Sequence, residues 1–194
     1  MFKKILLMCV CVLSLILSGC SQSKQIDKAS IAEIVTVFEN EGKTYYSFYF
    51  LSSSDTPVYT TVCADSFESA CEKARNESVS NLMLTKLELF VTEESVARKT
   101  LKNDIEFISR NSYLSPLMYV TLCDSGVVEM LGSDKEFGEK VSELIILNTK
   151  KDSSVSVTPL SIFNSFSDNN KKELALSYIN SNSELKSEII KINP

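Results

Sequence analysis

The first 20 residues of the chain restrict where its folded part can begin. Lys3 and Lys4 precede an apolar run, Ile5–Leu13, which continues with one interruption to Leu17. This order of basic and apolar residues is typical of a signal peptide. The apolar stretch of about 13 residues is too short to cross a bilayer as a helix, which takes about 20. We therefore predict a cleaved leader over residues 1–19 and not a permanent membrane span.

The leader ends in Leu17-Ser18-Gly19-Cys20, the sequence of a bacterial lipobox. Cleavage by the lipoprotein signal peptidase requires small residues before an invariant Cys, whose thiol becomes a thioether to diacylglycerol. Two acyl chains, at about 0.8 kcal/mol per buried methylene, attach a protein stably to a bilayer. We expect lipidation of Cys20 and a lipid-anchored location on the extracytoplasmic face of the cell membrane. The alternative is an ordinary leader followed by a buried core cysteine.

The segment after the lipobox is short and polar. Residues 20–28 show no apolar periodicity, which indicates a tether. The chain is 44% hydrophobic, which suffices for a continuous core. We predict one globular domain over residues 29–194.

Composition excludes several classes of function. Histidine is absent from the 194 residues, which removes Ser-His-Asp and Cys-His catalysis and His-ligated zinc. The 20 Lys and Arg against 25 Asp and Glu give a net charge of −5, the wrong sign for binding a phosphate backbone. The five glycines form no phosphate-binding loop. We expect no enzymatic activity, no cofactor, no metal site and no nucleic-acid partner.

The first half of the folded part begins with strand patterns. Apolar runs predict strands over residues 31–38 and 44–51, joined through Gly42 in a hairpin, and a short strand over 58–63. The aromatic side chains of the second strand are assigned to the sheet core, with a ligand platform as the alternative. A helix follows to about Ser80, capped by Asp65 with Glu68 as its capping-box partner. Its predicted buried face is Phe67, Ala70, Cys71, Ala74 and Ser78.

Strands and helices then alternate. Residues 82–91 are predicted as one strand, 117–123 as another, and 173–179 and 185–192 as two more. Helices are predicted from Thr92 and from Asp124 to Gly132, with a longer one after these and a short one possible over 158–167. For the helix from Thr92 the predicted buried stripe is Ala97, Leu101, Ile105 and Ile108, and for the longer helix the predicted inner face is Phe137, Val141, Leu144 and Ile145. The possible helix over 158–167 would carry Leu160, Phe163 and Phe166.

This alternation sets the fold class. Strands joined through helices of this length pair in parallel, whereas the opening hairpin is antiparallel. We therefore predict an α+β fold, a mixed β-sheet covered by three to four helices, in a single domain.

Few side chains offer chemistry. Cys63, Cys71 and Cys123 have no CxxC spacing, and buried free thiols are the favoured interpretation. Glu93 and Glu94 could be read as paired carboxylates, but neighbouring residues diverge on a helix and both fit the chemistry of a helix start. We therefore predict no catalytic, cofactor-binding or metal-binding residue, and Cys20 is the single predicted site.

Several segments together resemble a known family. They are Phe67-Glu68-Ser69-Ala70, Leu82-Met83-Leu84, Leu87-Glu88-Leu89-Phe90-Val91 followed by Glu93-Glu94 and Ala97-Arg98, Ile105 to Arg110, Tyr119-Val120, and Val128-Glu129-Met130-Leu131. In this order they resemble the N-terminal domain of the Ger(x)C family, the lipoprotein C subunits of spore germinant receptors. Members usually have Trp-Asp where this chain has Ser21-Gln22.

The resemblance implies a function. It implies a membrane-anchored, non-enzymatic accessory subunit in nutrient-triggered spore germination, in the inner spore membrane beside integral-membrane germinant receptor subunits. The alternative is a solute- or peptide-binding surface lipoprotein unrelated to germination.

Overall fold

The computed structural model describes residues 30–52, 57–79, 81–134, 136–168, 173–181 and 186–192. An eight-stranded mixed sheet forms its centre, with the strand order β3-β2-β1-β5-β6-β7-β8 and the short β4 paired to β1. Cys20, the leader and the tether lie outside the described residues, so their assignments stay predictions.

The antiparallel end of the sheet confirms the predicted hairpin and third strand. β1 (Ser30–Asn40) pairs with β2 (Lys43–Phe50), which pairs with β3 (Val58–Cys63). The connecting turn places Glu41 at φ 51° and Gly42 at φ 74°. Two successive residues with positive φ match the twist of a hairpin, and glycine adopts this conformation without steric cost.

The middle of the sheet is parallel, as predicted. β1 is parallel to β5 (Leu89–Glu93), which is followed by β6 (Tyr119–Cys123) and β7 (Leu174–Asn180). The last strand, β8 (Lys186–Ile192), returns antiparallel to β7.

The prediction of one strand over residues 82–91 was wrong. β4 (Leu82–Met83) pairs with the start of β1, and β5 pairs with its continuation, with a tight turn between them. Leu84 and Leu87 in this turn are buried. Their apolar side chains extended the strand pattern across a segment that leaves the sheet.

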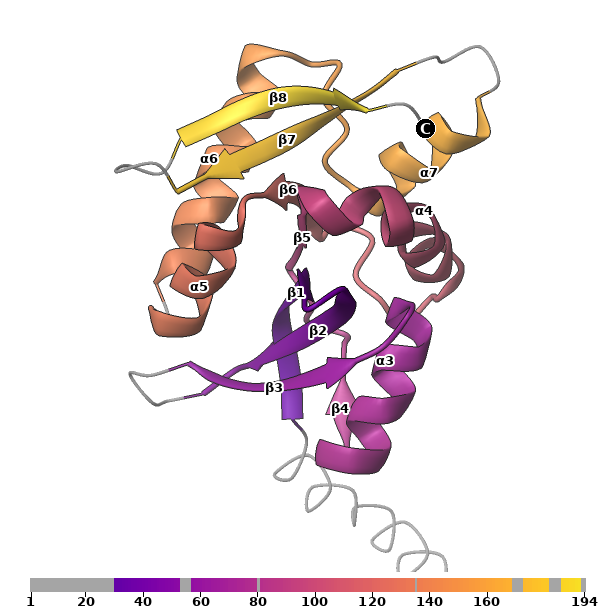
Figure 1. Ribbon diagram of the computed structural model, residues 1–194. Coiled ribbons are helices and arrows are strands. Elements are labelled where there is room, and N and C mark those ends of the chain that lie inside the picture. The colour runs from indigo at the N-terminus through magenta and orange to yellow at the C-terminus, as the bar shows by residue number, and fades with distance from the viewer. Residues whose placement is uncertain are drawn as a thin grey trace, which may run out of the picture.

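Helices cover both faces of the sheet (Figure 1). α3 (Phe67–Lys73), α4 (Glu94–Arg110) and α7 (Pro159–Ser167) pack on one face, and α5 (Ser125–Ser133) and α6 (Phe137–Lys151) on the other. Because side chains alternate along a strand, those of β5 point in turn to the two faces of the sheet. Phe90 belongs to the core under α3 and α4, whereas Leu89 and Val91 belong to the core under α5 and α6.

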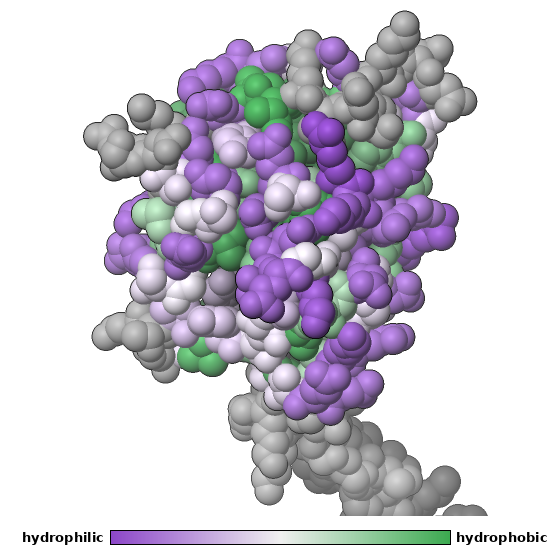
Figure 2. Space-filling view, in the orientation of Figure 1, coloured by the Kyte–Doolittle hydropathy of each residue, from purple (hydrophilic) through white to green (hydrophobic). Residues whose placement is uncertain are grey.

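The α+β class with a mixed sheet is confirmed. Within the described ranges the α-helices number five, more than the three to four predicted, because the weakly patterned segment 158–167 also folds as a helix. None of the described helices is long and apolar enough to span a bilayer. The molecular face in Figure 2 is mostly hydrophilic, with small separate apolar areas.

The first helix differs from its prediction at both ends. Ser66, not Asp65, is the N-cap and accepts a hydrogen bond from Ser69 N–H, so Glu68 is not a capping-box partner. After Lys73 the helix continues as a π-helix, η1 (Ala74–Ser78), closed by a bond from Val79 N–H to Ala74 O. The wider π turn breaks the spacing of three and four. Ser78 is therefore exposed, contrary to the prediction.

The later helices confirm most predicted faces. α4 buries Ala97, Leu101, Ile105 and Ile108, although it begins at Glu94 because Thr92 still belongs to β5. α6 buries Phe137, Val141 and Ile145, with Leu144 half-buried. The possible helix over 158–167 is present as α7. Its Ile162 is fully buried and Phe163 and Phe166 pack half-buried against the core, whereas Leu160 is 58% exposed.

The three thiols are unpaired in the structure. Cys71 and Cys123 are buried as predicted, and burial raises the pKa of Cys71 to about 12 and that of Cys123 well above its ordinary value. Cys63 is exposed, so the prediction that its thiol is buried was wrong. It lies on β3 at the edge of the sheet and points away from buried Val62.

Candidate functional site: a groove at the carboxyl end of β1

A groove of about 580 Å³ opens at the carboxyl end of β1, beside the end of β5. Its floor is formed by the last residues of β1 and by β2 and β3, and α5 forms one wall. We call it the β1–α5 groove. Its lining residues are Phe38, Glu39, Asn40, Ser47, Tyr49, Tyr59, Thr61, Glu93, Ser125, Val128, Glu129, Gly132 and Ser133.

Crossover topology puts the groove in this place. The carboxyl ends of parallel strands meet at one edge of a sheet, where open α/β sheets commonly bind ligands. Glu93 ends β5 at this edge, beside the end of β1. α5 and α6 cover the middle of this face, so the part over β2 and β3 stays open.

The floor carries aromatic rings and hydroxyl groups. The rings of Tyr49 and Tyr59 lie 5.1 Å apart at a tilt of 34°. Tyr49 is buried, which raises the pKa of its hydroxyl, whereas Tyr59 is 50% exposed. The hydroxyl oxygens of Ser47 and Thr61 lie 2.6 Å apart, within hydrogen-bond distance. The floor can thus stack against a flat or apolar group and hydrogen-bond a polar one.

The rim of the groove is acidic. Glu93 accepts a hydrogen bond of 3.2 Å from the backbone N–H of Glu39. The Glu39 carboxylate pairs with Lys99, and Glu129 is exposed on α5. The lining includes these three carboxylates and no Lys or Arg side chain. The charge of the groove therefore favours a cationic occupant.

The structure separates the two adjacent glutamates considered in the sequence. Glu93 lines the groove at the end of β5, and Glu94, the first residue of α4, does not. The aromatic residues Tyr46, Phe48 and Tyr49 of β2 are all buried in the core, as predicted. Tyr49 also lines the groove.

A second polar centre is fully buried. Asp104, on α4, accepts hydrogen bonds from the Phe67 backbone N–H at 2.8 Å and from the Tyr46 hydroxyl at 3.0 and 3.2 Å. It thereby ties α4 to the start of α3 and to β2. Burial raises the pKa of Asp104 to about 6, against the lowering effect of these hydrogen bonds. Burial beside Asp104 also raises the pKa of Tyr46.

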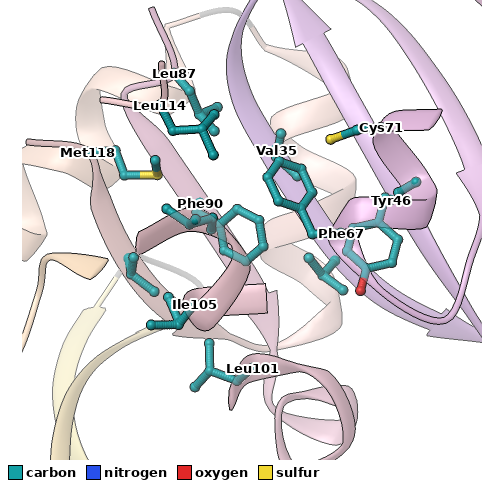
Figure 3. Close-up of a cluster of buried hydrophobic side chains, with 14 of the residues drawn as sticks. Val35, Tyr46, Phe67, Cys71, Leu87, Phe90, Leu101, Ile105, Leu114 and Met118 are labelled. Carbon is teal, nitrogen blue, oxygen red and sulfur yellow. The ribbon is translucent and has the colours of Figure 1, made fainter. Parts of the chain in front are cut away.

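Sequence reasoning missed Asp104, although a signal was present. Positions 97, 101, 104 and 108 are spaced by four, three and four, so Asp104 falls within the buried stripe of α4. A carboxylate at such a position has to find donors, and the N-terminus of α3 supplies one. Figure 3 shows the surrounding core, where Phe67 packs between Tyr46 and Phe90.

The described residues offer little for metal-dependent chemistry. Across them, no three Cys, Asp or Glu side chains gather in a way that could hold a metal ion. What the β1–α5 groove supplies is stacking, hydroxyl groups and negative charge, which serve binding.

The comparison with protein families decides which class of protein this is. The family model of the spore germination protein N-terminal domain matches residues 22–181. The chain belongs to this family. The match confirms the resemblance drawn from the sequence and assigns the chain a role related to spore germination.

The matched range also covers the features described above. It begins two residues after Cys20 and includes both the β1–α5 groove and Asp104. No curated protein and no solved structure matched the chain.

Proposed function

We propose that this spore germination domain is a lipid-anchored, non-enzymatic accessory subunit of a nutrient receptor. One observation carries the proposal: the family match begins at residue 22, directly after the lipobox that ends in Cys20. Diacylglycerol on Cys20 would hold the chain on the extracytoplasmic face of the membrane, which in the spore is the inner membrane. Integral-membrane receptor subunits are the proposed partners.

The fold is consistent with an anchor at this end. β1 begins at Ser30, ten positions after Cys20, so its amino end lies within about 36 Å of the lipid at full extension. The β1–α5 groove is at the opposite end of β1, around Phe38–Asn40. Partner contacts at the groove would therefore not compete with the lipid attachment.

A second candidate function is binding of a solute or peptide by a surface lipoprotein outside germination. The size of the β1–α5 groove, about 580 Å³, favours it, because pockets of a few hundred Å³ commonly hold small ligands. In this case the groove would be filled by a free molecule and the chain would need no membrane-protein partner.

Affinity purification of the tagged chain from spore membranes distinguishes the two. We expect integral-membrane subunits to be recovered in stoichiometric amounts after mild cross-linking. A control strain carrying the tagged Cys20→Ala chain should recover far less of them, because it lacks the lipid. Recovery of the wild-type chain without any membrane-protein partner would contradict the accessory role and favour the second candidate.

A further inference from the structure

We propose that β3 binds an extended segment of a partner protein as an added strand, with basic side chains of that segment reaching the β1–α5 groove. β3 is the terminal strand of the sheet and pairs only with β2 among the described strands. An unpaired strand edge presents a row of N–H and C=O groups that can pair with another chain. This inference uses one part of the proposed function, namely that the partner of the chain is another protein.

The register shows which backbone groups of β3 point away from β2. Ala64 N–H donates to Thr44 O, which marks the hydrogen-bonded pairs of this ladder. Alternation then directs the backbone groups of Val58, Thr60 and Val62 toward β2 and those of Tyr59, Thr61 and Cys63 outward. The Lys73 ammonium donates to Cys63 O at 2.7 Å, as this parity requires. Tyr59 and Thr61 therefore present their N–H and C=O groups at the edge.

The two edges of the sheet differ in sequence. β8, with the sequence KSEIIKI, contains two lysines and a glutamate, and charge of this kind discourages pairing with another strand. β3, with the sequence VYTTVC, contains no charged residue and no proline. Its β-branched and aromatic residues favour extended partners. The β3 edge beside the groove thus lacks such charges in its own sequence, and Lys73 of α3 covers it only at Cys63 O.

The groove explains the side chains expected of the partner. Tyr59 and Thr61 line both the edge and the groove, so alternate side chains of an added strand would lie over it. Glu93 and Glu129 line this space, and Glu39, which also lines it, pairs with Lys99. Lys or Arg at alternate positions would meet these carboxylates, and acidic residues there would be repelled.

A second copy of the chain is a poorer occupant. Pairing of β3 with itself would bring two acidic grooves together, in a chain whose net charge is −5. Like charges at an interface cost affinity. A basic segment of a different protein has the complementary charge.

The test uses the purified full chain in detergent and a synthetic peptide, acetyl-Thr-Lys-Val-Thr-Val-Lys-Thr-amide. This peptide has both lysines on one face when extended. We expect it to bind and to slow hydrogen exchange at the amides of Tyr59 and Thr61. A matched peptide with Glu in place of both Lys should bind at least tenfold more weakly. Absence of binding, or equal binding of the two peptides, would overturn the proposal.

Two variants at one position separate backbone pairing from side-chain contact. Thr61→Pro removes an outward N–H that β2 does not use, and proline is tolerated on edge strands at such positions. Thr61→Val loses the same hydroxyl but keeps the N–H. Both variants lose the Thr61 hydroxyl, which lines the groove, so the comparison between them reports the backbone N–H alone. We expect affinity to be at least tenfold lower in Thr61→Pro than in Thr61→Val, because the partner loses a backbone hydrogen bond and its own carbonyl group is left unpaired. Equal affinity of the two variants would refute strand addition.

A modified peptide keeps the test decisive if Thr61→Pro does not fold. One peptide is N-methylated at both Val residues and another at the central Thr and both Lys residues. Strand addition uses one edge of the peptide, so one version should lose binding and the other should keep it. Retention by both would overturn the proposal. If the wild-type chain forms a dimer and Thr61→Pro is a monomer, a second copy of the chain occupies the edge instead.

Discussion

At the scale of single residues, the account depends first on Cys20. We predict that the Cys20 thiol accepts diacylglycerol, so a Cys20→Ala chain should remain an uncleaved and unacylated precursor. Metabolic labelling with palmitate, followed by gel analysis of the immunoprecipitated chain, measures this directly. Label that survives in Cys20→Ala would refute the lipidation assignment. Cys63→Ala is a matched control on an exposed thiol of the folded part and should keep its label.

Asp104 is the residue whose ionisation matters most for stability. Its pKa is about 6 in the fold against an ordinary value of 3.8, so folding favours the protonated form. The stability that Asp104 contributes is fully present below about pH 4 and is lost as the pH rises through about 6. At 1.36 kcal/mol per pKa unit, this difference in pKa between the folded and unfolded states corresponds to about 3 kcal/mol in the free energy of unfolding.

Asp104→Asn isolates this effect. Asparagine keeps an oxygen that can accept from Phe67 N–H but cannot ionise. We expect the free energy of unfolding of the wild type, minus that of Asp104→Asn, to fall by up to about 3 kcal/mol between pH 4 and pH 7. Urea melts across this range measure it. A difference that does not change with pH would show that Asp104 has no raised pKa in the fold.

At the scale of elements, the helix faces can be tested by truncation. Leu101 and Ile105 on α4 and Phe137 on α6 are each at most 3% exposed. Replacing any one by Ala should lower the free energy of unfolding by about 2 to 5 kcal/mol through lost burial and a residual cavity. Leu117, 79% exposed before β6, is the matched control, and Leu117→Ala should cost far less. Equal losses in urea melts would contradict the assigned faces.

Two glycines of α5 should respond in opposite directions to the same change. A Cβ at Gly126 would clash with Ser181 Oγ, and Ser181 Oγ also donates a hydrogen bond to Asp124, the N-cap of the helix. Gly126→Ala should therefore destabilise the fold by about 1 to 3 kcal/mol. At Gly132 the nearest atom is Tyr49 Oη at 3.8 Å, so Gly132→Ala should gain about 0.5 to 1 kcal/mol from helix propensity. Thermal melts of both variants measure these changes. Equal shifts in melting temperature would contradict the packing described around the two glycines.

Local patterns predicted most elements because they are set by neighbours in sequence. The hairpin at Gly42, the Asp124 cap and the stripe from Ala97 to Ile108 are all of this kind. The errors arose where distant residues decide. Leu84 and Leu87 are buried by tertiary contacts outside any strand, and the π turn after Lys73 interrupts a regular spacing.

The β1–α5 groove and the burial of Asp104 could not be predicted from local sequence patterns for the same reason. The groove joins the end of β1 to β3 and α5, and Asp104 meets donors 37 and 58 positions away. No local pattern brings such residues together. The Asp within an apolar stripe was the one readable sign.

At the scale of the whole molecule, negative charge and sheet topology set how the chain meets partners. A second groove, of about 480 Å³, lies between α6 and the starts of β1 and β5, and glutamates predominate in its lining. Like the β1–α5 groove it is lined without Lys or Arg. Such surfaces repel anionic lipid headgroups, so they would not assist the membrane attachment that we propose through acyl chains on Cys20. Association with a basic partner should weaken as the salt concentration rises.

The measurement that tests the central claim most directly is nutrient-triggered germination of spores that carry the wild-type gene, a deletion, or the Cys20→Ala gene in its place. Loss of optical density after nutrient addition reports germination. The account predicts that the deletion and Cys20→Ala both slow the response to at least one nutrient, and that the wild-type gene restores it. Deletion spores that respond to every nutrient tested at the wild-type rate would contradict a role of this chain as an accessory receptor subunit.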